Sequence, residues 1–504
     1  MARTVAIGLQ SFEEIRENNY FYIDKTNIIK EWWESGDAVT LITRPRRFGK
    51  TLNMSMLECF FSNQYANRAD LFEGLSIWEE EKYKQLQGTY PVIFVSFASV
   101  KDKSFEDAKF SMVELFLDLY KRYPYVETDE MLVQAKKTVI RQVGEGKPIT
   151  VENTVLTHAM NGLASKLYEH FGKKVLILLD EYDTPMQEAW LGGYWDDIVD
   201  LFRNMFNDTL KTNPYLYRAV LTGITRVSKE SIFSDLNHLK VVTVSSDLYA
   251  DCFGFTQEEV SDALEEYGIS EQKDVVKEWY DGFTFGKHTD IYNPWSIINY
   301  LDEKKFGSYW VNTSSNGLVN SLMRKGDADT KMIVEDLIRG KSFKAKIDEQ
   351  IVFNQLNESN DAVWSLLLAS GYLKVMNNVA LKTFSYFDSG NQPSYSEPER
   401  FYHGFVLGLM VDLSDRYVLT SNRESGFGRY DVMLEPKNKE DNAYIIEFKV
   451  HDADDEDTLQ DTVAAALAQI EDKKYDTLLV EKGVPADKIY KYGFAFQGKT
   501  VLIG

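Results

Sequence analysis

Apolar residues recur along the first half of the chain in two alternating patterns. Short β-branched runs predict strands, and longer segments with apolar residues at intervals of three and four predict helices, as in SFEDAKFSMVELFLDLYKRY from Ser104 to Tyr123. The two patterns alternate from about Asp37 to Ser246. This alternation is typical of an α/β domain with a parallel sheet covered by helices. The predicted strands are residues 38–43, 91–97, 174–180, 217–223 and 240–246.

The pattern changes after Cys252. Helical segments such as TQEEVSDALEEYG and DAVWSLLLASGYL follow with few β-branched runs, which predicts a helical lid or connector domain over residues 251–388 behind a first domain of residues 1–250. The segment 387–400, FDSGNQPSYSEPER, concentrates Pro, Ser, Gly and Asn, as expected of a connector between domains.

Residues 398–504 predict a small third domain of mixed α and β structure. A helical pattern, PERFYHGFVLGLMVDLSDRY, opens it. Two predicted strands follow, RYDVMLEP and AYIIEFKV, then an alanine-rich helix near 458–475 and a closing hairpin in YGFAFQGKTVLIG. The acidic run HDADDEDTLQD before that helix lacks the glycine and the terminal glutamate of a calcium loop, so we interpret it as a solvated helix N-terminus.

The composition narrows the choice of partners. Lys and Arg number 56 against 78 Asp and Glu, a formal charge of −22, which repels phosphate backbones at long range. Any nucleic-acid contact must therefore be local. Two cysteines, nearly two hundred positions apart, form no disulfide framework, and the chain contains no run of about 18 apolar residues. We expect a cytoplasmic protein without membrane contact, and the sequence leaves open a homo-oligomer or a protein partner.

The stretch RPRRFGKT, residues 44–51, lies between the first predicted strand and the helical pattern TLNMSMLECFF. Gly49, Lys50 and Thr51 fall where a phosphate-binding loop needs them: Lys50 to reach the β and γ phosphates of ATP and Thr51 to bind Mg²⁺. Arg44 stands where the first glycine of such a loop is expected. Taken alone, the stretch is also compatible with an ordinary basic turn before a helix.

An acidic pair ends the buried strand KVLILLD. Asp180 is the candidate ligand of Mg²⁺ and Glu181 the candidate that polarises the attacking water, although a solvated loop explains the pair equally well in isolation. The later strand, 217–223, places Thr222 where it can sense the γ phosphate. Arg226 is a candidate charge-stabilising arginine, with a surface salt bridge as the alternative.

Three stretches, NNYFYIDKTNIIKEWWESGDAVTLITRPRRFGKT, LLDEYDTP and WYDGFTFGKHTDIYNPWSIINYL, together resemble the AAA-ATPase-like proteins of bacteria. The resemblance spans roughly the first 300 residues. It implies a P-loop NTPase fold, ATP as the ligand, and the arginine at position 44 as the family's own variant.

The roles of the loop arginines are a separate question. We hypothesise that Arg44, Arg46 and Arg47 contact phosphate or clamp Asp183, with structural pairing to nearby acids as the alternative. Aromatic residues of the third stretch are interpreted as core that anchors the helical domain rather than as a base-stacking platform; they are Tyr280, Phe283, Phe285, Tyr292 and Trp295.

Asp431 lies in one predicted C-terminal strand, and Glu447 and Lys449 lie two apart in the next, so the latter two share a face. Two carboxylates and a lysine at one place can hold Mg²⁺, activate a water and stabilise charge on a phosphorus under attack. A hairpin with an ordinary salt bridge on its solvated face is the alternative for the pattern alone.

The stretches around these residues, including IIEFKV, AAALAQIEDKKY and KYGFAFQGKTVLI, resemble the PD-(D/E)XK nuclease domain, over about 398–504. The resemblance implies a restriction-endonuclease-like fold, Asp431 and Glu447 as metal ligands, and Lys449 as the catalytic lysine. It also implies support from Gln469 and Tyr475. Glu399 and Glu424 are the candidates for an additional acid.

We therefore predict an ATPase coupled to an endonuclease that cleaves phosphodiester bonds of nucleic acid, most simply DNA, with Mg²⁺. The rival hypothesis is a nucleotide-dependent switch or scaffold whose nuclease fold only binds nucleic acid or a partner protein.

Overall fold

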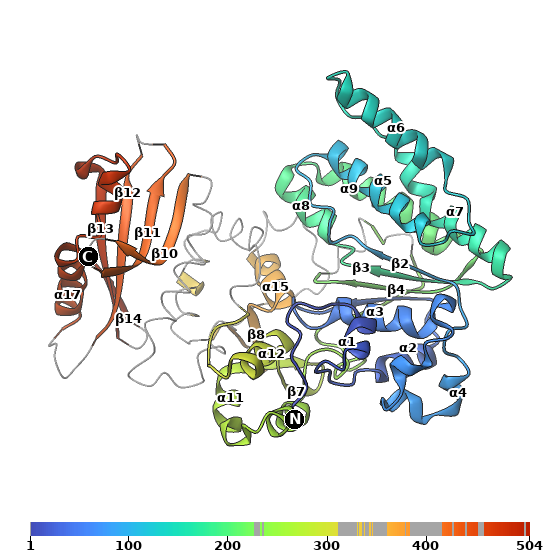
Figure 1. The fold of residues 1–504 in the computed structure, drawn as a ribbon, viewed down its shortest axis with the longest axis horizontal. Coiled ribbons are helices and arrows are strands. Elements are labelled where there is room, and N and C mark those ends of the chain that lie inside the picture. Colours follow the sequence, from blue (N-terminus) through green and yellow to red (C-terminus); the bar gives the residue numbers. More distant parts are fainter. Residues whose placement is uncertain are drawn as a thin grey trace. The chain divides into compact units, whose positions relative to one another are not determined.

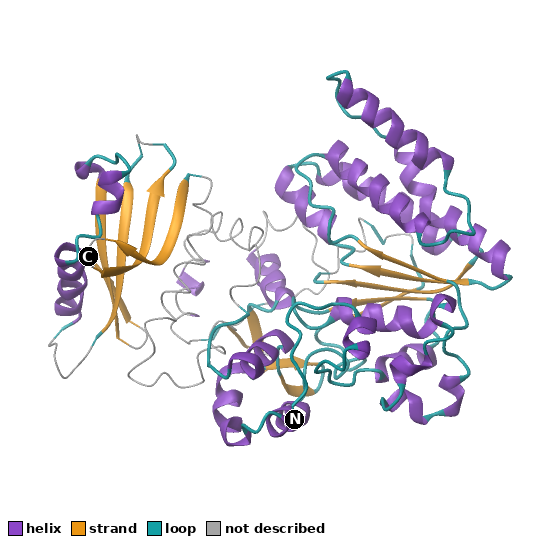
Figure 2. Cartoon of the chain, in the orientation of Figure 1, coloured by secondary structure: helices purple, strands orange, loops and turns teal. Residues whose placement is uncertain are grey.

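A computed structural model of the 504-residue chain describes residues 2–225, 232–233 and 236–310, eight positions between 330 and 345, and residues 360–377, 380–383, 416–425, 428–438, 441–451, 458–497 and 500–504. These form two compact units (Figures 1 and 2). The first contains residues 1–273, 282–304 and 345–375, and the second contains 274–281, 305–344 and 376–504.

The first unit is built on a five-stranded parallel sheet. Its strands are β1 (Val39–Thr43), β2 (Val92–Ser96), β3 (Val175–Asp180), β4 (Leu216–Gly223) and β5 (Leu239–Val242). Their order across the sheet is β2-β3-β4-β1-β5, with every pair parallel. All residues of β1 and β3 are buried, as expected for central strands covered on both faces. The sequence predicted each of these strands to within a few residues of its observed ends.

Helices cover both faces of this sheet (Figure 1). One side carries α5 (Phe105–Lys121), α6 (Glu130–Gly144), α7 (Asn153–Phe171), α8 (Thr184–Gly192) and α9 (Trp195–Phe206). The other carries α1 (Phe12–Glu17), α2 (Asn27–Ser35), α3 (Lys50–Phe61) and the short α4 (Glu81–Lys84). Because β1 lies between β4 and β5, the loops after β1, β3 and β4 meet at the carboxyl edge of the sheet, which is where open α/β sheets bind ligands.

The described residues of the range 251–388 form helices and two small hairpins. The helices are α10 (Gln257–Glu266), α11 (Lys273–Tyr280), α12 (Pro294–Glu303) and α15 (Asn360–Ser370). The hairpins, which the sequence pattern did not predict, are β6 (Phe283–Phe285) with β7 (His288–Ile291) and β8 (Leu373–Asn377) with β9 (Ala380–Thr383). Phe283, Phe285 and Tyr292 are buried, which confirms that these aromatics are core. The predicted boundaries near 250 and 398 stay predictions.

The second unit contains a five-stranded mixed sheet in the order β10-β11-β12-β13-β14. Its strands are β10 (Tyr417–Ser425), β11 (Gly428–Pro436), β12 (Ala443–Val450), β13 (Ile489–Gln497) and β14 (Thr500–Ile503), and β12 with β13 is the parallel pair. The helices α17 (Leu459–Asp472) and α18 (Thr477–Glu481) follow β12. The two predicted strands, the alanine-rich helix and the closing hairpin are confirmed, whereas β10 was not predicted. The predicted opening helix of this domain lies outside the described residues, except for its last two positions.

The start of α17 agrees with its predicted capping. Thr458 accepts a hydrogen bond from the backbone of Asp461, and the Asp461 carboxylate accepts one from the backbone of Thr458, which is a capping box. Within the described residues, no helix is both long and apolar enough to cross a membrane.

Candidate functional sites

The loop between β1 and α3 has the backbone of a phosphate-binding loop. The chain leaves β1 at Thr43, and α3 begins at Lys50 with Gly49 as its N-cap. Gly49 has φ 79°, in the left-handed region that favours glycine, and Arg47 adopts φ 67° two residues earlier. Two left-handed residues turn the chain sharply into the helix. The free backbone N–H groups of the first turn of α3 therefore lie at the carboxyl edge of the sheet.

Lys50 holds this loop together. Its ammonium donates hydrogen bonds to the carbonyls of Arg44, at 3.0 Å, and Pro45, at 2.9 Å. Burial lowers the pKa of Lys50, while the nearby Glu181, Asp183 and Asp180 act in the opposite direction. A lysine of this kind can exchange two carbonyl contacts for the oxygens of an incoming phosphate.

Asp180, at the end of β3, is the centre of a buried hydrogen-bond network. Its carboxylate accepts hydrogen bonds from the hydroxyls of Thr51, at 2.8 Å, Thr222, at 2.6 Å, and Ser96, at 3.3 Å. Burial raises the pKa of Asp180, and the hydroxyls of Thr222 and Thr51 oppose that shift. The structure thus brings together the predicted residues of α3, β3 and β4. Sequence analysis missed Ser96, although it ends the neighbouring strand β2 and pairs with Asp180 in register.

These oxygens suit a hard divalent cation. Carboxylate and hydroxyl oxygens are the ligands that Mg²⁺ takes beside a nucleoside triphosphate. Thr51 and Asp180 lie within hydrogen-bond distance of each other, next to the lysine that would contact the phosphates. The residues present therefore fit the predicted Mg²⁺ and ATP.

Glu181 follows directly, in an unusual backbone conformation. Its φ of 50° lies in the left-handed region, which is strained for a side chain with a β carbon and clusters at functional sites. Its half-buried carboxylate accepts a hydrogen bond from the Thr184 hydroxyl at 3.2 Å. Because of this turn the two side chains point in different directions. The Asp180 carboxylate stays in the hydrogen-bond network, and the Glu181 carboxylate lies just beyond the end of β3. Arg226 lies outside the described residues.

Asp183 and Gln187 connect the phosphate loop to the loop that follows β4. Asp183 is buried and its Oδ2 accepts hydrogen bonds at 3.0 Å from the backbone of Ile224 and from both the backbone and the hydroxyl of Thr225. Gln187, on α8, donates to the same oxygen at 3.0 Å and accepts from Arg46 at 3.3 Å. The Gln187 amide therefore links a loop cation to a buried carboxylate. The sequence carried no signal for Gln187.

Arg44 makes contacts that neither hypothesis named. Its side chain is fully buried and donates to the carbonyls of Thr43 at 2.9 Å, Thr243 at 2.7 Å, Leu248 at 3.3 Å and Tyr249 at 3.2 Å. Its guanidinium also lies over the rings of Phe253 and Phe285, at 5.5 Å and 4.8 Å. A guanidinium enclosed by carbonyls and rings has no path to a phosphate. Arg44 therefore braces the segment after β5 against the loop.

The other two loop arginines are closer to solvent. Arg46 is half-buried and near enough to Lys50 to lower the pKa of that lysine, so it stays a candidate phosphate contact. Arg47 is exposed and lies over the ring of Trp295 at 4.4 Å, a cation–π contact. Asp183 receives its hydrogen bonds from Ile224, Thr225 and Gln187 rather than from these arginines, so the proposed arginine clamp of Asp183 is not supported.

The C-terminal constellation lies on one face of the second sheet. Val432 pairs with Ile446 and Met433 with Ile445, and continuing this antiparallel register by one residue brings Asp431 opposite Glu447. Directly opposed residues share a face, and Lys449 lies on it two positions further along β12. The Asp431 carboxylate also accepts a hydrogen bond at 2.8 Å from the backbone of Phe448. The backbone register therefore puts the three residues on one face of the sheet, and their roles stay predictions.

Helix α17 supplies Gln469, and the turn that follows the helix supplies Tyr475, the two supporting residues that the resemblance implied. The Gln469 side chain donates to the Glu447 carboxylate and, at 3.3 Å, to the Tyr475 hydroxyl. Burial raises the pKa of Tyr475, and the nearby Glu447 and Asp431 raise it further. Because Glu447 is only 2% exposed, this amide contact offsets part of the cost of burying its carboxylate. The arrangement confirms the predicted placement of Gln469 and Tyr475 beside the two acids.

A glycine lets α17 approach the strands at this point. Gly493 pairs with Glu447 in the parallel β12–β13 ladder, and a β carbon added to it would lie 2.8 Å from the Val463 carbonyl and 3.0 Å from Ala466. Two opposed carboxylates beside a lysine form an oxygen-rich set that fits Mg²⁺. Glu399 lies outside the described residues, and Glu424 is described only by its place in β10, opposite Arg429.

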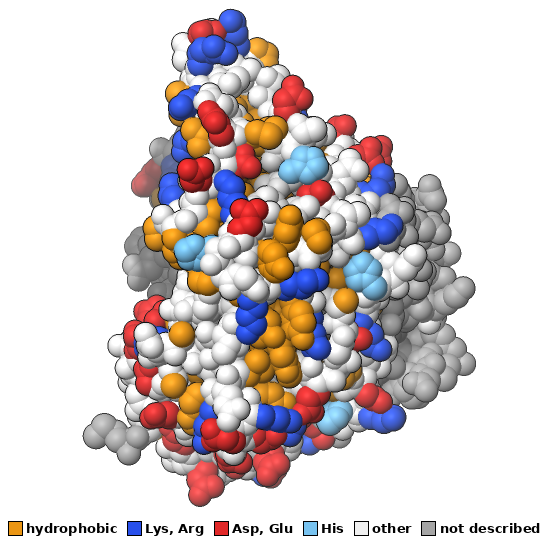
Figure 3. Space-filling view, turned by 90° about the vertical axis from the view of Figure 1, so that its right-hand side faces the viewer, with side chains coloured by type: hydrophobic (Ala, Val, Ile, Leu, Met, Phe, Trp, Pro, Cys, Tyr) orange, Lys and Arg blue, Asp and Glu red, His pale blue; other side chains and the backbone are white. Residues whose placement is uncertain are grey.

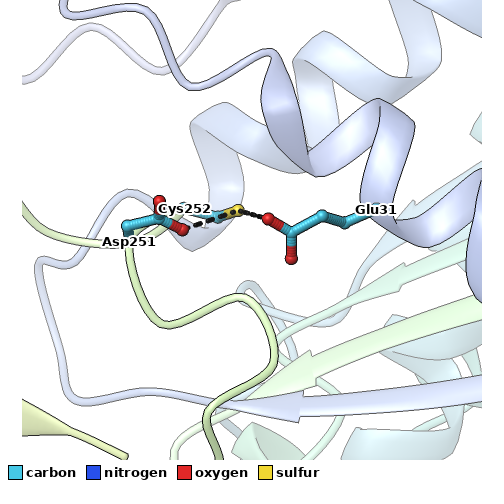
Figure 4. A group of neighbouring side chains, drawn as sticks. All are labelled: Glu31, Asp251 and Cys252. Carbon is cyan, nitrogen blue, oxygen red and sulfur yellow. Dashed lines mark hydrogen bonds between the residues drawn. The ribbon is translucent and has the colours of Figure 1, made fainter. Parts of the chain in front are cut away.

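A third group of ligating side chains is structural. Glu31, Asp251 and Cys252 converge beside α2 (Figure 4), and among the described residues they are the group of three that could geometrically hold an ion. Burial and the two carboxylates raise the pKa of the Cys252 thiol well above its usual value. The protonated thiol donates to Glu31, at 3.8 Å, and Asp251, at 3.7 Å, while Glu31 also accepts from the backbone of Tyr249. These contacts tie α2 to the segment that Arg44 braces.

The two folds define the class of protein. The parallel sheet with a phosphate loop between β1 and α3 is that of a P-loop NTPase, and the C-terminal mixed sheet with its opposed acids is that of a PD-(D/E)XK domain. Residues 6–233 match the family model described as "Predicted AAA-ATPase", and residues 397–504 match that of the PD-(D/E)XK nuclease superfamily. The chain therefore carries an AAA-ATPase-like domain followed by a PD-(D/E)XK nuclease superfamily domain, as the resemblance implied.

Sequence and structure comparisons also find individual proteins that are similar to this chain. An uncharacterised protein in the vnfD 5′ region of Azotobacter chroococcum mcd 1 is 26% identical over 331 residues, which is 65% of this chain and 57% of that relative. The ORC2 protein of Aeropyrum pernix, solved with ADPNP and ADP, is 10% identical with a TM-score of 0.24, over 81% of this chain and 96% of that one. A mutant of RuvB from Thermogota maritima is 11% identical with a TM-score of 0.23, over 75% and 95%.

Proposed function

We propose that the first unit binds ATP with Mg²⁺ and hydrolyses the bond between its β and γ phosphates. The observation that carries this proposal is the network in which Asp180 joins Thr51 of the phosphate-loop helix to Thr222 of β4. This network supports the proposal because a carboxylate and a hydroxyl are ligands that a triphosphate-bound Mg²⁺ takes. Bound Mg²⁺ would neutralise charge on the β and γ phosphates.

The chain's own residues take the remaining roles. Lys50 would leave the carbonyls of Arg44 and Pro45 for the β and γ phosphate oxygens. Glu181 would accept a hydrogen bond from the attacking water, orient it toward phosphorus and take up its proton. Thr222, which lies in β4 and is hydrogen-bonded to Asp180, would sense the γ phosphate. Arg46 would add a second positive charge to the site.

We propose further that the second unit cleaves phosphodiester bonds of nucleic acid. Asp431 and Glu447 would hold Mg²⁺, which on binding supplies a Lewis acid and an activated water. Lys449 would stabilise the charge that develops on the phosphate under attack. Gln469 would keep the Glu447 carboxylate in position, since its contact leaves that side chain little freedom.

The nuclease proposal is tested by cleavage of plasmid and single-stranded DNA with Mg²⁺. We expect Lys449→Ala and Asp431→Ala to abolish cutting, and Lys437→Ala, an exposed lysine just beyond the end of β11, to retain it. Cutting that survives both site substitutions would refute the nuclease assignment. Binding without any cutting by the wild type would instead favour a nucleotide-dependent switch or scaffold, the rival that the charge of −22 supports.

The ATPase proposal is tested separately by calorimetric titration with ATP and Mg²⁺ and by phosphate release. Lys50→Ala should lose affinity for ATP. Glu181→Gln should keep the affinity and lose hydrolysis, because the amide retains the size of the carboxylate but cannot accept the proton of the water. Unchanged ATP affinity in Lys50→Ala would leave the loop without a nucleotide function.

A further inference from the structure

Three aromatic rings pack against one another at the amino-terminal edge of the first sheet. Trp33 belongs to the end of α2, Tyr90 lies two residues before β2, and Tyr217 is the second residue of β4. Their centroids lie 5.5 Å apart for Trp33 and Tyr90, 5.8 Å for Trp33 and Tyr217, and 5.3 Å for the stacked tyrosines. The Tyr217 side chain is 39% exposed, and the other two are half-buried. A rigid aromatic surface therefore faces solvent here.

Two cations accompany the rings. The Lys173 ammonium lies 3.6 Å from the Tyr90 centroid and donates to the Thr89 carbonyl at 2.7 Å. The Arg218 guanidinium lies 5.0 Å from the Trp33 centroid and 5.4 Å from that of Tyr217, and it donates to the Trp33 carbonyl at 2.7 Å. Burial lowers the pKa of Lys173.

The charge of this pair is not neutralised locally. In the part of the chain that the structure describes, neither Lys173 nor Arg218 forms an ion pair with a carboxylate, in contrast to lysines and arginines such as Arg3, Lys25 and Arg122. The space-filling view of this face shows hydrophobic side chains gathered together with lysines and arginines beside them (Figure 3). Positive charge fixed next to exposed rings is a combination that binds an anion carrying flat, apolar groups.

We propose that Trp33, Tyr90 and Tyr217, with Lys173 and Arg218, form a binding surface for single-stranded nucleic acid. Bases of a single strand are free to stack on the exposed tyrosine, and its phosphates are drawn to the two cations. A duplex keeps its bases stacked inside and cannot use the rings. In a chain of charge −22, a nucleic-acid contact must be local, and this surface provides one.

The location separates this surface from the nucleotide site. Lys50 and Asp180 lie at the carboxyl edge of the parallel sheet, whereas Tyr90 and Tyr217 lie at its amino edge. ATP and a nucleic-acid strand would therefore occupy opposite edges of the same sheet. This surface would hold the strand that the proposed nuclease cleaves, so its biological meaning rests on that proposed function. Binding to the surface can still be measured independently of cleavage.

The test is the fluorescence anisotropy of a labelled oligothymidylate of about 20 nucleotides with the full chain, in EDTA to prevent cleavage. Tyr217→Ala should weaken binding about five- to hundredfold, the range of a lost base stack. Tyr217→Phe should bind almost like the wild type because it keeps the ring. Lys173→Gln should weaken binding and reduce the slope of log affinity against log salt by about 0.7. Ile140→Ala, an exposed apolar residue of α6, is the matched control and should change nothing.

Several results would overturn the inference. No binding by the wild type, or equal binding by Tyr217→Ala, would remove the stacking surface. A change of molar mass in light scattering for Tyr217→Ala, with oligonucleotide affinity unchanged, would make it a surface for self-association instead. If Tyr217→Ala loses binding while the wild type cuts no substrate, the surface stands and the nuclease proposal fails. If Tyr217→Ala binds and cuts normally, the nuclease stands and the surface fails.

Discussion

Replacing Arg44 by glycine should destabilise the protein, although glycine is the usual residue at the start of a phosphate-binding loop. In this chain the arginine side chain fills a buried position and donates to four backbone carbonyls, three of which belong to residues 243–249. Glycine would supply neither the donors nor the volume. The substitution therefore distinguishes two possible roles of Arg44, bracing the loop or binding phosphate.

The magnitude follows from those contacts. A hydrogen bond to a charged group contributes about 1.5–3 kcal/mol, and a buried acceptor left without a donor costs about 1–3 kcal/mol. Relief from burying a charge, and water entering the space, offset part of the total, so we expect a net loss of about 3–5 kcal/mol. The first unit has roughly 330 residues, and an unfolding entropy of about 2.1 cal/mol/K per residue converts this loss into an unfolding temperature lower by about 4–7 °C. Arg44→Met, which keeps the packing on Phe253 and Phe285, should lose somewhat less.

The assay is thermal unfolding followed by fluorescence, with ATP affinity measured on the same samples at a temperature where both variants are folded. Arg47→Gly is the matched control, because relief of its left-handed backbone offsets the lost contact with Trp295 and leaves stability within about 1 kcal/mol. Arg44→Gly that unfolds at the wild-type temperature but binds ATP much more weakly would refute the bracing role and make Arg44 a phosphate ligand.

Three further predictions concern the two sites. Gln187→Glu should slow ATP hydrolysis at neutral pH, because a carboxylate cannot donate a hydrogen bond to Asp183. Activity should recover as the pH falls and the new side chain becomes protonated. Gln187→Ala, measured in the same pH series of phosphate release, should show no such recovery. Because burial raises the pKa of Asp180, protons should compete with Mg²⁺ at a higher pH than they do for an ordinary aspartate. The calorimetric affinity for Mg²⁺–ATP should therefore fall as the pH falls through that raised pKa and be regained above it. An affinity that does not change down to pH about 4 would contradict this prediction. Gln469→Ala should lower metal affinity and cleavage about 10–100-fold by freeing Glu447, without changing ATP affinity.

The strands and most candidate residues of the first site could be predicted because their signals are local. Each parallel strand is a short apolar run, and the loop residues Gly49, Lys50 and Thr51 are fixed by the junction of strand and helix. The partners of Arg44 could not be predicted. Three of the four are backbone carbonyls about two hundred positions later, which carry no side-chain signature. Gln187 was missed for a related reason: an isolated glutamine on a helix gains its role only from the two charges that the fold brings to it.

The second sheet shows the same limit. Alternation in RYDVMLEP and AYIIEFKV identifies β11 and β12 and puts Glu447 and Lys449 on one face. β10, with the sequence YVLTSNRES, is too polar to be recognised as a strand, because much of its stability comes from its pairing with β11 rather than from its own apolar residues. The opposition of Asp431 and Glu447 depends on a register that the sequence does not specify alone.

The binding of Mn²⁺, followed by electron paramagnetic resonance with and without a non-hydrolysable ATP analogue, tests most directly whether the carboxylates of the two sheets form two separate phosphate-handling centres. The account predicts a class of sites that depends on the analogue and is lost in Asp180→Asn. It also predicts a class that does not depend on the analogue and is lost in Asp431→Asn. A single class of sites, or Mn²⁺ binding that neither substitution changes, would contradict it.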